Sequence, residues 1–206
     1  PAQSMPDQRP VRRALERSEL VVVQEAFATT ATCAYADLLL PATTWGEKTG
    51  TVTNSERRIS RVRPAVAAPG AARHDWSAVV DFARRLEALL PSRQAQQTLF
   101  PYTLDSEAGA QAIWNEHRES TRGRDLDITG LSWASLDSHG PQQWPLPEGC
   151  ASGRKRLYED RVFATPDGRA RFVATPYRPT SEQRGPRYPF SLNTGRLRGQ
   201  WHGMSR

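Results

Sequence analysis

Two short apolar runs constrain the fold of this chain more than any other feature. They are residues 20–23, LVVV, and residues 38–40, LLL, and polar residues follow each of them at once. Short runs of branched or leucine side chains are typical of strands that are buried on both faces of a parallel sheet. We therefore predict an α/β fold with a parallel sheet at its centre.

Polar side chains follow both predicted strands. Gln24 and Glu25 come directly after the first strand, and residues 45–48, WGEK, follow the second. Ligands of open α/β sheets bind at the carboxyl ends of the strands. Glu25 could accept hydrogen bonds from ribose hydroxyls or amino groups, and Lys48 could reach a phosphate or a ring carbonyl. Taken alone, each fits better as a solvated surface residue.

Asp75 opens a predicted helix over residues 75–90, in which apolar residues recur at helical spacing. Its carboxylate can cap the helix, or it can accept two hydrogen bonds from the N–H edge of guanine. We also predict a β-hairpin over residues 50–62, with its turn at Asn54, and a further helix over residues 107–119.

A polar and aromatic loop lies near the end of the sequence. Thr194, Gly195 and Arg196 offer a hydroxyl, a flexible backbone and a guanidinium fork, which together suit a phosphate group. Residues 200–203, QWHG, add amide, indole and imidazole donors. A hairpin turn followed by an aromatic anchor accounts for the same residues, so both interpretations stay open.

Composition and missing motifs narrow the function classes. The net charge of +6 and the pI of about 9.9 are compatible with a nucleic-acid-binding module. However, only Lys48 and Lys155 of the 28 basic residues are lysines, and the arginines are scattered along the chain. Cys33 and Cys150 form no CxxC pair, which argues against a disulfide framework, a zinc site or an iron–sulfur site made by this chain alone.

The chain also lacks the motifs of a self-contained enzyme. We find no GxGxxG, no phosphate-binding P-loop and no GxSxG elbow, so we assign no catalytic residue and no metal ligand. No apolar run approaches the roughly 20 residues that span a bilayer.

Four segments in this order resemble the molybdopterin oxidoreductases. They are ADLLLPATTWGEKTGTVTNSERR from residue 36, the APG and HDW pieces at residues 68–76, PDGRARF from residue 166 and NTGRLRGQWHGMSR from residue 193. Within that family the chain is most similar to the catalytic subunit of bacterial assimilatory nitrate reductase. The resemblance implies reduction of nitrate to nitrite in a cytoplasmic enzyme that receives electrons from a donor protein or reductase subunit. A formate dehydrogenase α subunit is the alternative within the family.

The resemblance also implies cofactors. Members hold molybdenum between two molybdopterin guanine dinucleotides and carry a [4Fe-4S] cluster, whose ligands, like the molybdenum ligand, would lie outside this chain. Carried over by motif, the residues expected to bind the dinucleotide are Gln24, Glu25, Lys48, Asp75, Thr194, Gly195, Arg196, Leu197, Gln200, Trp201, His202 and Gly203. The same resemblance favours ligand-binding roles for Glu25, Lys48 and Asp75 over their alternative roles as surface residues or as a helix cap.

Residues 1–153 are expected to form part of a parallel-sheet dinucleotide-binding domain, and residues 154–206 the start of a C-terminal β-barrel domain. We expect the chain to be an internal piece of a longer enzyme, inactive by itself, with nitrate as the substrate of the whole protein and without nucleic-acid partners or a membrane span. Residues 140–149, GPQQWPLPEG, are a hypothetical lining of the substrate funnel.

Overall fold

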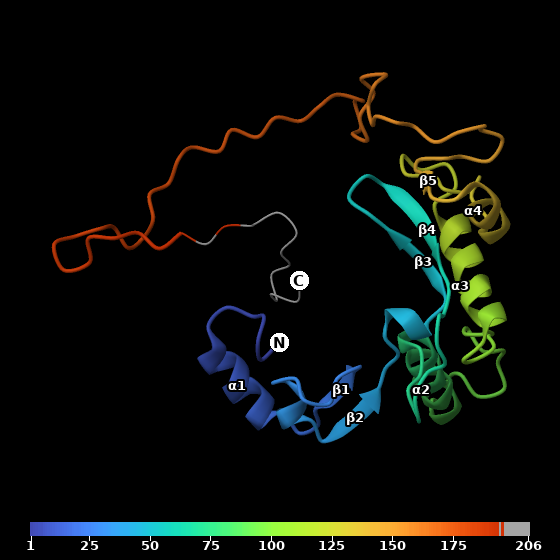
Figure 1. Cartoon of the computed structure of the whole chain (residues 1–206), viewed down its shortest axis with the longest axis horizontal. Coiled ribbons are helices and arrows are strands. Elements are labelled where there is room, and N and C mark those ends of the chain that lie inside the picture. The colour runs from blue at the N-terminus through green and yellow to red at the C-terminus, as the bar shows by residue number, and fades with distance from the viewer. Residues whose placement is uncertain (194, 196–206) are drawn as a thin grey trace. The chain divides into compact units, whose positions relative to one another are not determined.

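A computed structural model describes residues 1–193 and 195 (Figure 1). The chain divides into two units, one made of Ser18–Glu159 and the other of Pro1–Arg17 with Asp160–Arg206. The first unit contains all strands of the described residues and three of their α-helices. No helix among the described residues is both long and apolar enough to cross a bilayer.

The first unit begins with the predicted parallel pair. β1 (Val22–Glu25) and β2 (Leu38–Pro41) run parallel, with Val22 opposite Leu38, and the short helix η1 (Cys33–Tyr35) lies between them in sequence. The parallel sheet is thus confirmed. The prediction that both faces are buried is wrong, because Val22 and Leu38 are about half exposed. In the described residues only two strands form this sheet.

The predicted hairpin is also confirmed. β3 (Gly50–Thr53) and β4 (Arg58–Val62) are antiparallel, and a short β5 (Gln142–Gln143) pairs with the start of β4. The side chain of Asn54 shapes the turn, since its Oδ1 accepts hydrogen bonds from the backbone N–H groups of Glu56 and Arg58 at 2.9 and 3.0 Å. An asparagine at this place in a turn mimics a backbone acceptor.

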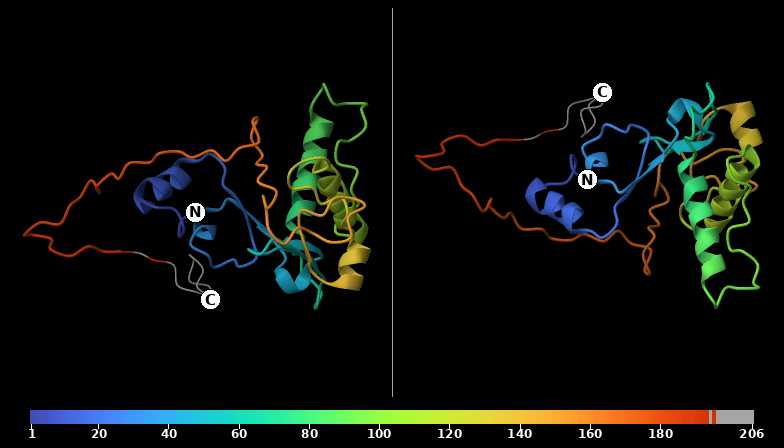
Figure 2. Two further views of the ribbon diagram at one scale, coloured as in Figure 1. Left: turned by 90° about the horizontal axis from the view of Figure 1, so that it is seen from above. Right: turned by 90° about the horizontal axis from the view of Figure 1, so that it is seen from below.

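Helices pack around this hairpin. α2 (Asp75–Leu89) and α3 (Glu107–Ser120) match the predicted helices and lie next to each other (Figure 2). α4 (Trp133–His139) is too short for its period to be recognised from sequence. The main core joins α3, α4, β4 and the loops between them; its buried members are Ile59, Ala110, Trp114, Ile128, Leu131, Trp133, Leu136 and Leu146.

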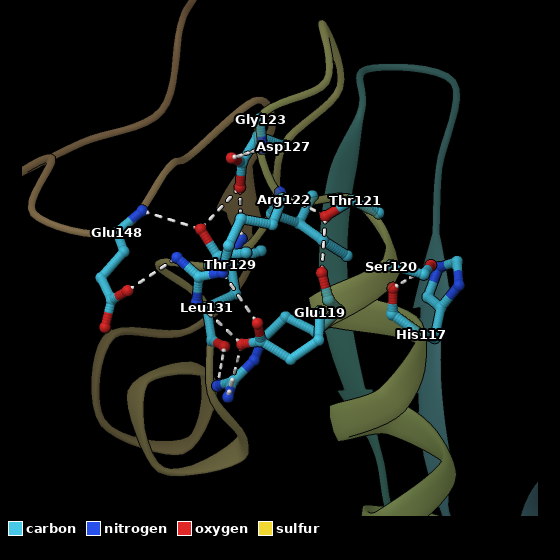
Figure 3. A network of polar contacts seen from close by, with 12 residues as sticks. His117, Glu119, Ser120, Thr121, Arg122, Gly123, Asp127, Thr129, Leu131 and Glu148 are labelled. Carbon is cyan, nitrogen blue, oxygen red and sulfur yellow. Dashed lines mark hydrogen bonds and ion pairs between the residues drawn. The ribbon is translucent and has the colours of Figure 1, made fainter.

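A dense polar network orders the connection between α3 and α4 (Figure 3). Asp127 is buried and accepts hydrogen bonds from the backbone N–H groups of Gly123 and Thr129, both at 2.8 Å, and from the Thr129 hydroxyl at 2.6 Å. Arg122 pairs through two nitrogens with the carboxylate of Glu119 and through a third with that of Glu148, at 2.8 to 2.9 Å. These side-chain contacts stabilise an irregular loop that has few backbone hydrogen bonds of a helix or a sheet.

The second unit holds α1 (Gln8–Arg17) and the segment from residue 160 onward. A turn forms at residues 166–168, PDG, where Asp167 Oδ1 accepts from the Arg169 N–H and Gly168 adopts a φ of +68°. The prediction of barrel strands beyond residue 154 is wrong for the residues that the structure describes there. In that stretch the isolated bridge between Gly185 and Tyr188 is the sole strand-like pairing. A strand needs a neighbour for its backbone groups, and these residues provide almost none.

Candidate functional site

Three parallel segments end at one edge in the first unit. β1 ends at Glu25 and β2 ends at Pro41. The segment that leads into α2 extends the sheet by one residue pair, a parallel bridge between Arg73 and Ala42. The Ala42 N–H donates to the Glu25 carbonyl at 3.1 Å, and the Arg73 N–H donates to the Pro41 carbonyl at 3.0 Å. The Thr43 N–H donates in turn to the Arg73 carbonyl at 3.0 Å. All three carboxyl ends therefore meet where ligands of α/β sheets bind.

Asp75 lies at this edge as the first residue of α2. His74 occupies the N-cap position, so the alternative that Asp75 caps the helix is wrong. Its Oδ1 accepts a hydrogen bond from Gln24 Nε2 at 2.8 Å, and its Oδ2 forms an ion pair with Lys48 Nζ at 3.1 Å. Three residues that are distant in sequence are thus brought together through one carboxylate.

Lys48 is positioned by the short helix η2 (Trp45–Glu47) that precedes it. A capping box starts η2: the Thr44 side chain accepts from the Glu47 N–H, and Glu47 Oε2 accepts from the Thr44 N–H at 2.8 Å. The ammonium group of Lys48 lies 5.2 Å from the centroid of the Trp45 ring, within the range of a cation–π interaction. The lysine is therefore held between an aromatic face and Asp75.

Glu25 stands at the end of β1, on the same edge. One of its carboxylate oxygens accepts from the backbone N–H of Ala26 at 2.8 Å and more weakly from that of Phe27 at 3.4 Å. The carboxylate thus folds over the start of its own loop. This local contact fixes its orientation at the rim of the site.

These side chains line one open cleft of about 270 Å³. That volume lies just below the range of about 300–1,000 Å³ that is usual for ligand pockets. The predicted residues Gln24, Glu25, Lys48 and Asp75 all belong to it, and its full lining is Gln24, Glu25, Ala26, Phe27, Ala42, Thr43, Thr44, Trp45, Lys48 and Asp75.

Several of the lining residues are not among the predicted site residues. Thr43 is buried, and its hydroxyl lies 3.1 Å from His74 Nδ1, a contact between residues 31 positions apart that no local pattern reveals. Phe27 and Trp45 are large aromatic side chains that are 64% and 66% exposed. Their signal in the sequence is an aromatic residue shortly after each strand, next to the polar residues of the strand ends.

The second predicted group lies almost wholly outside the described residues. Gly195 is described and exposed. The other members, Thr194, Arg196, Leu197, Gln200, Trp201, His202 and Gly203, fall among residues of which the structure gives no description.

A second cavity, of about 460 Å³, lies beside the hairpin and α3, and none of the predicted cofactor-binding residues is in its lining. Trp144 lines it, with its indole N–H donating to the Thr53 hydroxyl at 3.0 Å. This contact fixes Trp144 on the hairpin. The role of residues 140–149 in a substrate funnel stays a prediction.

Comparison with known proteins assigns the family. The sequence model described as molybdopterin oxidoreductase matches residues 1–85. The chain is 39% identical to a nitrate reductase of Synechocystis sp. and 40% identical to one of Klebsiella oxytoca, with 100% of the chain covered in each case. It is also 35% identical, over 98% of its length, to the F420-dependent formate dehydrogenase subunit alpha of Methanocaldococcus jannaschii.

The chain spans about a quarter of the length of these relatives, namely 28%, 23% and 27%. The matched residues 1–85 include both strands of the parallel pair and the four residues Gln24, Glu25, Lys48 and Asp75 that meet in the cleft. By sequence the chain belongs to the molybdopterin oxidoreductase family.

Proposed function

We propose that this chain binds the nucleotide end of a molybdopterin guanine dinucleotide within a molybdenum-dependent nitrate reductase. One observation supports it most: Gln24, Glu25, Lys48 and Asp75 line a single cleft at the carboxyl edge of a parallel sheet. The nitrate reductases that match over the full chain support the choice of enzyme.

The chemistry of the cleft fits such a ligand. Guanine presents an N–H and an NH₂ group side by side, and a carboxylate can accept both hydrogen bonds. A carboxylate has about four acceptor sites, and in Asp75 one contact to Gln24 and one to Lys48 are formed, so acceptor capacity is left for a base. Glu25 at the rim suits ribose hydroxyls, and the ammonium of Lys48 suits a phosphate oxygen.

The residues of this chain would position the cofactor and set the electrostatic field around its nucleotide. When bound, the molybdenum cofactor supplies the oxygen-atom and electron transfer that converts nitrate to nitrite. Electrons would come from a donor protein or reductase subunit through a [4Fe-4S] cluster, in the cytoplasm. We assign none of these steps to residues of this chain, and we expect the chain alone to reduce no nitrate.

Formate oxidation is the second candidate, because a formate dehydrogenase α subunit matches 98% of the chain at 35% identity. Both enzyme types would use the nucleotide-binding cleft in the same way. The two candidates are separated by assaying the longer protein that contains this chain with nitrate and with formate; turnover of formate alone would select the second.

Binding of guanosine monophosphate (GMP) to the 206-residue chain tests the proposal. We expect Asp75→Ala to weaken binding about tenfold, which corresponds to about 1.4 kcal/mol, because the acceptor for the guanine N–H edge is lost. Lys48→Ala should weaken GMP binding but leave guanosine binding nearly unchanged, since its partner is the phosphate. Chemical-shift titration by NMR measures both affinities.

Asp125→Ala is the matched control, because Asp125 is an exposed carboxylate outside the cleft lining. It should bind GMP as the unchanged chain does. Equal affinity of the Asp75→Ala variant and the unchanged chain would reject the guanine-binding role of Asp75.

A further inference from the structure

Two exposed aromatic side chains border the same polar cleft. Phe27 is 64% exposed and lies just after β1, and Trp45 is 66% exposed and lies just after β2. Exposure alone does not mark a site, since Phe82 of α2 is 67% exposed as well. Phe27 and Trp45 both stand at the edge where ligands of α/β sheets bind.

The backbone that carries Trp45 is held firmly although the side chain is exposed. The capping box between Thr44 and Glu47 starts η2, and the Gly46 carbonyl accepts hydrogen bonds from the backbone N–H groups of Ala65 and Val66 at 2.7 and 3.1 Å. The backbone that carries the ring thus has a defined position before any ligand arrives. Pre-organisation of this kind reduces the entropy cost of binding.

The surroundings of the ring suit a nucleobase. Lys48 Nζ lies 5.2 Å from the centroid of the Trp45 ring, and two-thirds of the side chain is still exposed, so the indole offers open aromatic surface. Lys48 also contacts Asp75 at 3.1 Å, which links the aromatic surface to the carboxylate proposed to read guanine. A flat base lying on the indole could thus direct its edge toward Asp75.

We infer that Trp45 is the stacking platform for the nucleobase in this cleft. The inference rests on the proposed function and adds separate roles for Trp45 and Asp75 in binding the base. Stacking on Trp45 contributes affinity for any purine, because every base has an aromatic face. Asp75 contributes the preference for guanine, because adenine lacks the pair of neighbouring N–H donors.

This division predicts two different patterns in the 206-residue chain. Trp45→Leu, which keeps an apolar side chain without an aromatic face, should weaken binding of both GMP and adenosine monophosphate (AMP) about tenfold, within the range of base stacking on aromatic side chains. Trp45→Phe should restore most of the loss. Asp75→Ala should weaken GMP binding and leave AMP binding nearly unchanged.

NMR titration gives the affinities and a direct signature. Base stacking should shift the indole N–H resonance of Trp45, which is identified by its absence in the Trp45→Leu variant. The control is Phe82→Ala, since Phe82 is an aromatic side chain of α2 that is 67% exposed and does not line the cleft. It should leave both affinities unchanged.

The outcomes separate the inference from the function on which it rests. If Trp45→Leu leaves the GMP and AMP affinities unchanged while Asp75→Ala weakens GMP binding, the stacking role is overturned and the guanine-binding role of Asp75 stands. Loss in Trp45→Leu together with full GMP affinity in Asp75→Ala would keep the stacking role and reject the guanine contact. Absence of GMP binding to the unchanged chain at millimolar concentration would reject both.

Discussion

At the scale of single residues, Arg61 shows how one buried charge can organise several elements. Its side chain is only 4% exposed, its guanidinium carbon lies 3.5 Å from the centroid of the Trp133 ring, and it pairs with Glu107 at 2.6 Å. Burial lowers the pKa of Arg61, and the nearby carboxylates of Asp137 and Glu107 oppose this effect. The guanidinium stays charged throughout the range in which proteins fold.

Truncation of Arg61 should therefore destabilise the fold. We expect Arg61→Ala to lower the free energy of unfolding by about 2–4 kcal/mol, because it removes a stacked, paired side chain from the interior. Arg63→Ala is a matched control: Arg63 also pairs with Asp137 but is 60% exposed, so its loss should cost at most about 1 kcal/mol. Urea unfolding measures both, and equal losses would contradict the structural role of Arg61.

The sequence was sufficient to single out Gln24, Glu25 and Lys48 as candidates only together with the family resemblance, because position at the strand ends does not distinguish them from solvated surface residues. It was not sufficient to show how they are held. The contact between Gln24 and Asp75 joins residues 51 positions apart, and the stacking of Arg61 on Trp133 joins two segments whose pairing depends on the tertiary fold. Such contacts have no local signature.

At the scale of elements, Gly109 sets how closely α3 approaches its neighbours. A Cβ atom there would lie 2.0 Å from the Thr103 carbonyl oxygen and 2.8 Å from the ring of Trp76. Both distances are shorter than van der Waals contact. The glycine thus permits a close packing of α3 against the preceding loop and the start of α2.

Replacement of this glycine should reverse the usual trend. In a helix interior Gly→Ala normally stabilises by about 0.5–1 kcal/mol, but we expect Gly109→Ala to destabilise by about 1–3 kcal/mol through overpacking. Gly46→Ala serves as control, since a Cβ there would meet only a Val66 methyl at 4.0 Å. Thermal unfolding measures both, and a raised melting temperature for Gly109→Ala would contradict the packing shown.

Most elements of the first unit follow from periodicity, and the exceptions have physical reasons. β5 and α4 are too short to show a period. β1 lies two residues later than its apolar run, because pairing with β2, rather than side-chain type, decides where the ladder begins. The start of a barrel was expected beyond residue 154, yet Phe172 and Phe190 are about 90% exposed, because a strand forms only where a neighbouring strand pairs with it.

At the scale of the whole chain, arginines fasten irregular segments to regular ones. Arg84 donates three hydrogen bonds to the carbonyls of Phe100 and Tyr102 at 2.6 to 2.8 Å, and Arg118 donates one to the Leu131 carbonyl at 2.8 Å. Arg57 holds the Lys155 carbonyl at 2.8 Å. A part of the positive charge therefore serves the fold itself, which gives the basic composition a role that needs no nucleic acid.

The stability of the whole chain should depend on pH through its carboxylates. Burial raises the pKa of Asp127, but hydrogen bonds from Thr129 and Gly123 outweigh burial, so the net pKa is lowered. Hydrogen bonds from arginines lower the pKa of Asp81 and of Glu119 in the same direction. Groups with a lowered pKa in the folded state stabilise it above their unfolded pKa, and this contribution is lost as pH falls through the folded value.

We therefore expect the free energy of unfolding to fall as the pH drops below about 4, the ordinary range of carboxyl groups. Asp127→Asn should lower stability at neutral pH and make the acid loss shallower, because one of the titrating groups is gone. Urea unfolding at a series of pH values from about 3 to about 7, which covers the ordinary titration range of carboxyl groups, measures the free energy of unfolding of both proteins. If the free energy of unfolding of Asp127→Asn falls as steeply with pH as that of the unchanged chain, the role of Asp127 is contradicted.

The parallel bridge between Ala42 and Arg73 also determines how far apart the outer segments of the sheet edge lie. Neighbouring strands are about 4.8 Å apart, so the backbone of Glu25 and the start of α2 are separated by two spacings, about 10 Å. The Glu25 carboxylate lies over its own loop, where it accepts a hydrogen bond from the Ala26 N–H. A molecule that contacts both acids therefore spans the sheet edge from the end of β1 to the start of α2, as the base and the sugar of a nucleoside are arranged to do.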